Sequence, residues 1–403
     1  MKKIMQREIF GIDYNIFLLG IVSLITDVSS EMISPILPSF IIAIGGTGIA
    51  IGLIGGIGDS LSSIIRVISG YLSDKKGERK KFIFSGYLLS SISKLFFPLS
   101  AHWSHIAVLK PIERIGKGIR TPARDALIAD LSKKTKRGKS FGFHRMMDTS
   151  GAIIGALLAL LIILFLGLYS TIEEISILRI VLFAAAIISF FALIPLLFVK
   201  EKKTQGKKGF KFLIKLKGLS KEFRSFVLVT TFFALGNFSY MFFILKAQIS
   251  FQEFFGINES IIIVIGLYII YNIFYAVFST PIGSLSDKIG RKKIIIIGYA
   301  IFSLTCLGFF LINTSIVYLA LFALYGLFYA FIEGTQRALA ADLSNKQHGL
   351  ALGTYHTFNA LAILPSSIIA GVIWDYYSPA YTFLYGFIIG ICAVFLAIKL
   401  IKE

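Results

Sequence analysis

The feature that most constrains this chain is a series of long apolar runs. About 20 apolar residues in a helix, at 1.5 Å per residue, cross the ~30 Å hydrocarbon core of a bilayer. Outer-membrane barrels instead alternate apolar and polar residues along short strands. The sequence therefore predicts an all-α membrane protein with twelve transmembrane helices. The runs cover residues 14–43, 49–72, 82–102, 106–128, 141–167, 178–199, 226–249, 260–282, 294–313, 315–340, 351–374 and 380–398.

The composition excludes the soluble classes of protein. Hydrophobic residues make up 56% of the 403 residues and charged residues 16%, against about 25% charged in a soluble domain. Both cysteines, Cys306 and Cys392, lie inside apolar runs, so no disulfide, metal site or cofactor is predicted. The first run follows basic residues as a signal peptide would. It carries Asp27 and Glu31 and lacks a small-residue cleavage site, so we interpret it as a span.

The connecting segments alternate sharply in charge. Those on one side, both ends of the chain included, hold 30 of the 41 Lys and Arg residues, and those on the other side hold none. The positive-inside rule then predicts a multi-pass protein of the cell membrane with both termini in the cytoplasm. The net charge of +19 is explained by this topology and by contact with anionic lipids. No motif that reads nucleic acid accompanies it.

The chain repeats itself across a basic linker at residues 200–225. GYLSDKKGERK begins at Gly70 and GSLSDKIGRKK begins at Gly283, while ALIADLS from Ala126 returns as ALAADLS from Ala338. Matches in the same order at nearly constant offset indicate a duplicated unit in parallel orientation, as in many secondary transporters. The predicted domains are therefore two pseudo-symmetric six-helix bundles, residues 1–199 and 226–403.

The first repeated motif resembles the signature loop of the major facilitator superfamily, G-x-L-x-D-x-x-G-x-[RK]-[RK]. The resemblance extends over the whole chain and implies that family's fold. It also implies a conformational latch that closes with the cytoplasmic side; the alternative is a turn with no switching role. The latch residues are Gly70, Asp74, Gly77 and Arg79 in the first copy and Gly283, Asp287, Gly290 and Arg291 in the second.

Ionisable residues inside the spans of the first half mark a candidate site, because they are costly in a bilayer. Residues 106–128 place Lys110, Glu113, Arg114, Lys117, Arg120 and Arg124 within an arc of about 120°. RIGKG, which begins at Arg114, resembles a family motif that lies near an acidic residue of the first helix in proton-coupled relatives. Asp27 and Glu31 occupy one face of that helix. We expect Asp27, Glu31, Arg114, Lys117 and Arg120 to serve proton coupling and substrate binding.

The second half offers a tyrosine-rich lining instead. Its candidate substrate contacts are Asn272, Tyr329 and Glu333. The prediction is a secondary transporter, not an enzyme, that moves a small anionic or zwitterionic solute by alternating access with protons. We expect a monomer in contact with membrane lipids. One alternative is proton-driven efflux of drugs or amphiphiles, although Gly151 and Gly155 lack the proline that ends the antiporters' fifth-helix motif. A second alternative is a non-transporting sensor, although no large soluble domain is present to carry its output.

Overall fold

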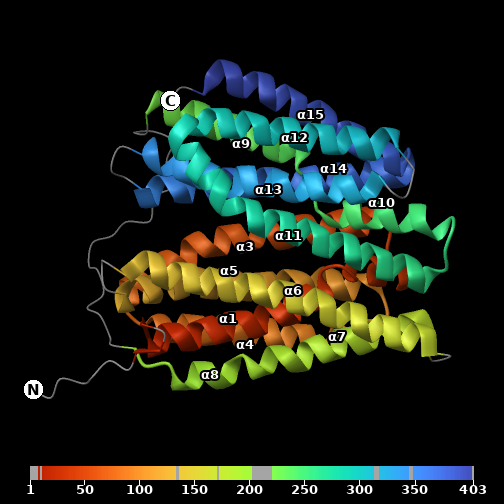
Figure 1. Ribbon diagram of the computed structural model, residues 1–403, viewed down its shortest axis with the longest axis horizontal. Coiled ribbons are helices and arrows are strands. Elements are labelled where there is room, and N and C mark those ends of the chain that lie inside the picture. The colour runs from red at the N-terminus through yellow and green to blue at the C-terminus, as the bar shows by residue number, and fades with distance from the viewer. Residues whose placement is uncertain are drawn as a thin grey trace, which may run out of the picture. The chain divides into compact units, whose positions relative to one another are not determined.

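The computed structural model describes residues 8–9, 11–132, 136–169, 172–201, 220–312, 317–344 and 348–401. Most of the predicted linker at 200–225 therefore lies outside the described residues. Two short antiparallel strands, β1 (Glu8–Ile9) and β2 (Ile12–Asp13), come first. The helices of Figure 1 are α1 (Tyr14–Ile33), α2 (Leu37–Ala43), α3 (Gly48–Lys76), α4 (Arg79–Leu95), α5 (Trp103–Leu131), α6 (Arg137–Tyr169), α7 (Glu174–Phe191), α8 (Leu193–Phe198), α9 (Lys221–Gly236), α10 (Met241–Gln252), α11 (Ile257–Ile289), α12 (Arg291–Leu311), α13 (Val317–Asp342), α14 (His348–Tyr376) and α15 (Pro379–Leu400).

The helices confirm the predicted all-α membrane fold. Within the described residues, ten helical segments are long and apolar enough to cross a membrane. The two remaining predicted spans, 82–102 and 106–128, correspond to α4 and α5. α4 has only 17 residues, and α5 carries the cationic face, so neither stands out by length and hydropathy alone.

Three of the predicted spans are broken, where continuous helices were expected. The run 14–43 divides into α1 and α2 near Pro35, whose nitrogen cannot donate to a helix carbonyl. The run 178–199 divides into α7 and α8 at Ala192. The run 226–249 divides into α9 and α10 at residues 237–240, where the backbone N–H of Ser239 donates to Ser367 Oγ at 3.2 Å. A side-chain acceptor there replaces the helix carbonyl, which a hydropathy pattern does not reveal.

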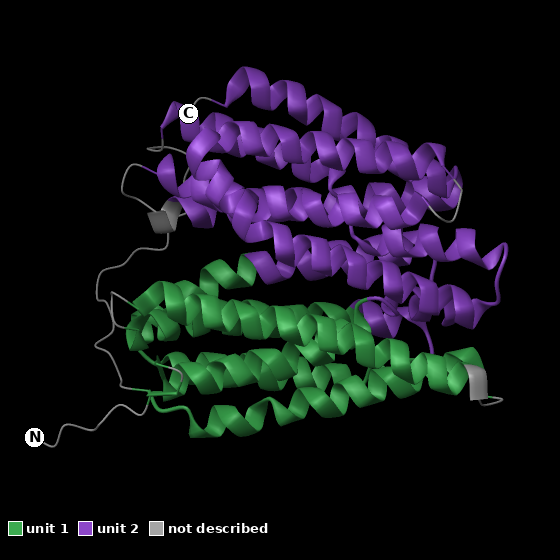
Figure 2. Cartoon of the chain, viewed as in Figure 1, with its two compact units in different colours: residues 1–34, 64–100, 108–212 green, residues 35–63, 101–107, 213–403 purple. Residues whose placement is uncertain are grey.

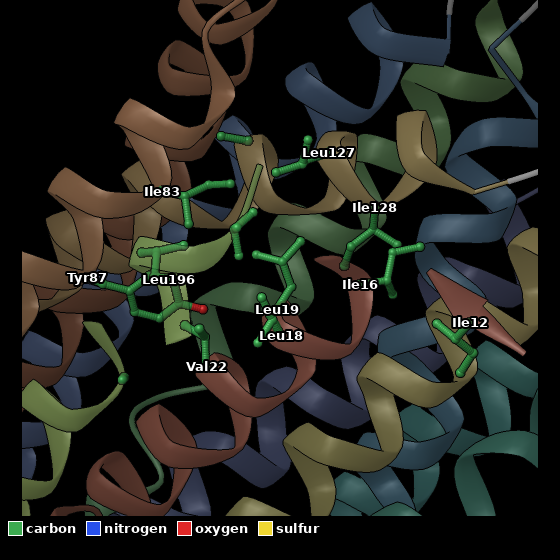
Figure 3. Close-up of a cluster of buried hydrophobic side chains, with 13 residues drawn as sticks. Ile12, Ile16, Leu18, Leu19, Val22, Ile83, Tyr87, Leu127, Ile128 and Leu196 are labelled. Atoms are coloured by element: carbon green, nitrogen blue, oxygen red, sulfur yellow. The ribbon is translucent and has the colours of Figure 1, made fainter. Parts of the chain in front are cut away.

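The described chain forms two compact units, shown in Figure 2. Unit 1 comprises residues 1–34, 64–100 and 108–212. Figure 3 shows its buried cluster, in which side chains of α1, among them Leu19 and Val22, meet Ile83 and Tyr87 of α4 and Leu127 of α5. This cluster fixes α1 beside α4 and α5, the helices that carry most of the candidate ionisable residues.

Close contact between α1 and α6 in unit 1 depends on two glycines. A Cβ on Gly151 would lie 2.5 Å from the Leu24 carbonyl oxygen, and a Cβ on Gly155 would overlap the Val28 carbonyl oxygen. The two backbones therefore touch, as in the small-residue contacts of other membrane helices. This packing gives the GAIIGA segment a structural role and positions α6 against the face of α1 that carries Asp27.

Unit 2 comprises residues 35–63, 101–107 and 213–403. Its interior is rich in stacked aromatic rings: the ring centroids of Phe233 and Tyr299 are 3.9 Å apart, and those of Phe243 and Tyr325 are 4.2 Å apart. Such pairs add about 0.5–1.5 kcal/mol each beyond the area they bury. These contacts tie α9, α10, α12 and α13 together and order the tyrosines of the second half.

The beginning of α3 packs inside unit 2 against α14. The Asp375 carboxylate accepts hydrogen bonds from the backbone N–H groups of Gly48, at 2.7 Å, and Ile49, at 2.8 Å. It thereby satisfies two of the donors left open at a helix N-terminus and complements the positive end of the helix dipole. A Cβ on Gly371 would lie 2.5 Å from the Gly48 carbonyl oxygen, so glycine is needed for this approach.

Candidate functional site

In unit 1, Arg79 connects the ends of three helices at the basic side of the chain. Its Nη1 lies 3.1 Å from Asp74 Oδ1 on α3, and its Nε lies 2.8 Å from Asp130 Oδ2 on α5. Gly77 turns the chain between α3 and α4 at a φ of 66°, a conformation that favours glycine. The predicted latch residues Asp74, Gly77 and Arg79 are thus adjacent, with Asp130 as an additional partner.

In unit 2, Arg291 makes the corresponding bridge. Its Nη2 lies 3.4 Å from Asp287 Oδ1 on α11, and its Nε lies 2.8 Å from Asp342 Oδ2 on α13. Gly290 forms the turn at a φ of 96°. The other two latch glycines differ in their surroundings: a Cβ on Gly70 would contact Pro122 at 3.4 Å, whereas one on Gly283 would meet no atom within 4 Å.

The two bridges explain why two motifs repeat. Asp130 belongs to ALIADLS and Asp342 to ALAADLS, so each arginine joins both repeated motifs of its own half. Two residues separate α3 from α4, and one residue separates α11 from α12. Because the second turn is one residue shorter, the first residue of α12 is Arg291, which corresponds in position to Arg79 at the start of α4. Asp130 and Asp342 were not among the predicted site residues, although the repeat of the second motif was the signal that could have identified them.

A further carboxylate supports the first bridge. Glu201 accepts hydrogen bonds from the backbone N–H groups of Arg79, at 2.5 Å, and Lys80, at 2.8 Å. Lys80 Nζ in turn donates to the carbonyl oxygens of Leu197 and Val199. Glu201 therefore caps α4 and holds the end of α8 beside it, a contact that no sequence pattern indicated.

The cationic face of α5 is divided among several partners. Lys110 Nζ lies 3.0 Å from Glu113 Oε2, both side chains being buried, and Arg114 Nε lies 3.9 Å from the same oxygen. Arg120 Nη1 donates to Ser90 Oγ at 2.7 Å, and its guanidinium lies 4.5 Å from the centre of the Tyr87 ring. Arg120, a predicted substrate contact, is therefore held against α4.

The acids of α1 lie near this face. Asp27 has Lys117, Arg124, Asp148 and Glu31 as its charged neighbours. Lys117 has Arg114, Asp27, Arg66 and Arg120. The structure thus brings Asp27, Glu31, Arg114 and Lys117 into one network of charges within unit 1.

One buried cation adds to this network from α4. The Lys94 ammonium donates to Ser29 Oγ and Ser30 Oγ of α1, each at 2.9 Å, and the side chain is only 1% exposed. Glu113, Arg120 and Asp27 are among its charged neighbours. A buried ammonium held by hydroxyls needs nearby acids or a bound anion to offset its desolvation.

The candidate residues of unit 2 form a separate set. Glu333 accepts hydrogen bonds from the Tyr275 hydroxyl and from Arg337 one helical turn away. Tyr329 lies beside it, with its hydroxyl 3.5 Å from that of Tyr325. Asn272 Nδ2 donates to the Tyr268 carbonyl oxygen of its own helix at 3.0 Å, so Asn272 satisfies backbone rather than facing Glu333. A small hollow beside this set is lined by Tyr240, Phe243, Ile244, Tyr268, Tyr271, Phe322 and Tyr325.

A comparison with protein families decides what kind of protein this is. The model of the Major Facilitator Superfamily matches residues 19–270 and 227–403. The chain belongs to the Major Facilitator Superfamily. Its family consists of transporters rather than enzymes, so the protein is a multi-pass membrane transporter of a small molecule.

Relatives and solved structures agree with this family assignment. The chain is 47% identical over 381 residues to an uncharacterized MFS-type transporter of Methanocaldococcus jannaschii, covering 94% of this chain and 92% of the relative. It is 31% identical over 153 residues to the quinolone resistance protein NorA of Staphylococcus aureus, covering 38% of this chain and 37% of that protein. The fold is similar to the nucleoside transporter NupG, with a TM-score of 0.74 at 14% identity over 96% of this chain and 98% of that one. It is also similar to the peptide transporter POT in complex with sulfate, with a TM-score of 0.73 at 16% identity over 98% and 95% of the two chains.

The described residues of this transporter bring no three His, Cys, Asp or Glu side chains together as a metal site would require. Cys306 and Cys392 are free thiols, and Cys306 is buried. The groups of the described interior are carboxylates, ammonium and guanidinium groups, the imidazole of His144, hydroxyls and aromatic faces.

Proposed function

We propose that this transporter couples protons to the movement of a small anionic or zwitterionic solute across the cell membrane. The two halves, residues 1–199 and 226–403, then alternate as bodies around a central site, joined by the linker at 200–225. Both termini face the cytoplasm in this proposal, in keeping with the basic charge of that side. The transporter acts as a monomer in contact with membrane lipids.

The observation that carries the proposal is the charge balance of the polar interior of unit 1. Cations outnumber acids there, although both are expensive to bury in a membrane. A solute with a negatively charged group would complete this balance. The cations are Arg66, Lys94, Lys110, Arg114, Lys117, Arg120 and Arg124, and the acids are Asp27, Glu31, Glu113, Asp125 and Asp148.

Within that set, Lys117 and Arg114 are the best candidates for binding the anion. Lys110 and Glu113 neutralise each other at 3.0 Å, and Arg120 is held by Ser90 and Tyr87. Lys117 is repelled by the nearby cations Arg114, Arg66 and Arg120, so an added anion would relieve repulsion as well as form a hydrogen bond.

Proton coupling is supported by the position of Asp27. This carboxylate has two acids, Asp148 and Glu31, and two cations, Lys117 and Arg124, as charged neighbours. When Asp27 or Glu31 is ionised, Lys117 is paired within the protein. When they are protonated, Lys117 is released to bind an anion. Solute and proton would therefore bind together and leave together.

A second candidate function is efflux of drugs or amphiphiles by proton antiport. The partial similarity to NorA favours it, as do the tyrosines and Glu333 of unit 2. Aromatic faces and a carboxylate suit an organic cation. Membership of a transporter family, in turn, argues against a non-transporting sensor.

The test is transport by purified protein in proteoliposomes that contain a pH-sensitive dye. Carboxylates, phosphate esters, amino acids and cationic amphiphiles are added in turn to the outside under an imposed pH gradient. Proton movement that depends on an anionic or zwitterionic solute supports the proposal. Proton movement with cationic amphiphiles alone supports the efflux function, and protein-free liposomes give the background.

A further inference from the structure

A continuous set of side-chain contacts crosses α5, α1 and α6 within unit 1. Arg124 Nη1 donates to Ser23 Oγ at 2.8 Å, and Ser23 Oγ lies 2.9 Å from His144 Nε2. His144 Nδ1 lies 3.5 Å from Asp148 Oδ2. Ser23 and His144 are 1% and 5% exposed, so both are buried in this conformation.

The arginine sets the direction of these contacts. A guanidinium can only donate hydrogen bonds, so Ser23 Oγ accepts from Arg124. The Ser23 hydroxyl is then free to donate its own proton to His144 Nε2, which acts as the acceptor. A neutral imidazole that accepts at Nε2 carries its proton at Nδ1, and that atom faces Asp148.

The far end of the contacts has an open position. Asp148 Oδ1 is buried and has no hydrogen-bond partner among the described residues. Asp148 is also one of the acids next to Asp27. This oxygen therefore leaves one hydrogen-bonding position on Asp148 open, next to the carboxylate of Asp27.

The contacts also run along the direction that protons must travel. His144 lies seven residues from the start of α6 and Asp148 eleven, about 10 Å and 17 Å at ~1.5 Å per residue. Arg124 lies seven residues from the end of α5. On α1, Asp27 is one turn further from the start of the helix than Ser23, and Glu31 is one turn beyond Asp27. The series from Ser23 to Glu31 therefore leads away from the basic end of α1, from the middle of that helix toward its far end.

We propose that Ser23 and His144 form a proton relay between the solvent on the basic side and the Asp148–Asp27 pair, with Arg124 as the residue that positions Ser23. This inference rests on the proton coupling proposed above and names the path by which the helix-1 acid exchanges its proton with the basic side.

The transfer is balanced in atoms and charge. When the basic side is open, a hydronium ion gives a proton to Ser23 Oγ as the Ser23 hydroxyl proton moves to His144 Nε2, and a neutral water molecule is left. The proton on Nδ1 moves to Asp148 Oδ2, a gap that a small side-chain rotation shortens. One proton enters at Ser23 and one arrives at Asp148. The Asp148 carboxylate is neutralised, and the His144 imidazole changes from its Nδ1–H to its Nε2–H form. Release is the same sequence in reverse.

Several charged groups surround the relay and set its pH range. His144 has Arg124 and Asp125 of α5 and Arg145 and Asp148 of α6 as charged neighbours. The cations disfavour a stable imidazolium, and the acids favour it. A histidine that passes a proton without retaining it suits this mixed environment.

The experiment follows carboxylic-acid protonation by infrared difference spectroscopy on the full chain in lipid nanodiscs. A pH jump between 5 and 8 supplies the proton, so no solute has to be known. The carboxylic-acid band of the Asp148–Asp27 pair is the wild-type band that is lost in Asp27→Asn and changed in Asp148→Asn. We expect His144→Gln and Ser23→Ala to slow its appearance and loss about tenfold or more, with the number of protons bound unchanged. Ser23→Thr, which keeps the hydroxyl, should restore the rate.

Two controls separate the relay from a structural effect. Ser91→Ala removes another buried hydroxyl of unit 1, one that donates to the Ser189 carbonyl oxygen, and His356→Gln removes a histidine of unit 2. Both should keep the wild-type rate. If His144→Gln also keeps it while the Asp27 band is present, Asp148 exchanges directly with water and the relay is wrong. If the wild type shows no such band, the proposed proton coupling and the relay both fail.

Discussion

Arg79 Nε lies 2.8 Å from Asp130 Oδ2, and Arg291 Nε lies 2.8 Å from Asp342 Oδ2. Each pair joins the start of one helix to the end of another within its own unit. The same contact therefore occurs in both halves of a duplicated chain, although the two turns differ in length by one residue.

The first prediction concerns these two pairs. Double-mutant cycles of Arg79→Gln with Asp130→Asn, and of Arg291→Gln with Asp342→Asn, should give coupling of similar size in both halves. We expect about 0.2–1 kcal/mol, because the aspartates are partly exposed, and the coupling should weaken with added salt. Denaturant unfolding of the purified protein measures it. Coupling in one half only would show that the duplicated contact has lost its role in the other.

The second prediction concerns Asp74, which shares Arg79 with Asp130. Since Asp130 still holds the arginine in Asp74→Asn, the fold should remain intact. If the loop is a latch, the variant shifts the population toward the inward-open state and slows turnover, with substrate affinity changed much less. Spin-label distances across the predicted cytoplasmic gate report the shift.

Glu78→Gln is the matched control for Asp74→Asn. Glu78 is the N-cap residue of α4 in the same turn, and its Oε2 lies 2.8 Å from Lys81 Nζ, with the Glu78 and Lys81 side chains 24% and 75% exposed. Its loss should leave the distances unchanged. Distances that are equally unchanged in Asp74→Asn would mean that the loop is a turn without a switching role.

The third prediction concerns the acids of α1. Asp27 and Glu31 share a network with Lys117, and protonation of either changes the charge that the solute meets. Glu31→Gln should abolish accumulation driven by a pH gradient while exchange across equal gradients continues. Survival of pH-driven accumulation in both Glu31→Gln and Asp27→Asn excludes these acids as the couplers.

The fourth prediction concerns Lys117. A charge-assisted hydrogen bond contributes about 1.5–3 kcal/mol, so Lys117→Gln should weaken binding of the transported anion roughly 10- to 150-fold. Lys117→Arg keeps the charge and should lose much less. Binding is measured at two pH values, and the lower pH should favour binding in the wild type because the proposed coupling has solute and proton bind together. If a cationic amphiphile binds best, and binds the Lys117→Gln variant equally well, the efflux function takes the place of the anion proposal.

The fifth prediction concerns the contact of α1 with α6. Gly151→Ala would place a Cβ 2.5 Å from the Leu24 carbonyl oxygen, and moving the helices apart to relieve it should cost about 1–3 kcal/mol of stability. Gly142→Ala is the matched control on the same helix, because a Cβ there meets no atom within 4 Å. Gly142→Ala should be neutral or stabilising by up to about 1 kcal/mol, since alanine favours a helix. Thermal unfolding of the two variants gives the comparison.

The predicted site residues show what helical spacing can predict about side-chain contacts and what it cannot. The arc on α5 grouped Lys110, Arg114, Lys117, Arg120 and Arg124 as one face. In the structure Lys110 and Arg114 share Glu113, whereas Arg120 meets Ser90 and Arg124 meets Ser23. Spacing along a helix gives the direction of a side chain to within a broad sector. It does not give the rotation and height of the neighbouring helix, which decide that Arg120 meets Tyr87 while Arg124 meets Ser23.

The sequence by itself determined the membrane class and the family of this protein. Length and hydropathy of a run suffice for a span, because every backbone polar group in a bilayer must be satisfied within a helix. The repeated motifs indicated the duplication and led to the prediction of a latch. Only the tertiary structure decided which charges pair, where Pro35 and residues 237–240 break the spans, and that Asp130, Asp342 and Glu201 complete the bridges at the ends of the helices. Those outcomes depend on contacts between residues distant in the chain, and a helix can meet its neighbours in many registers that share one hydropathy pattern.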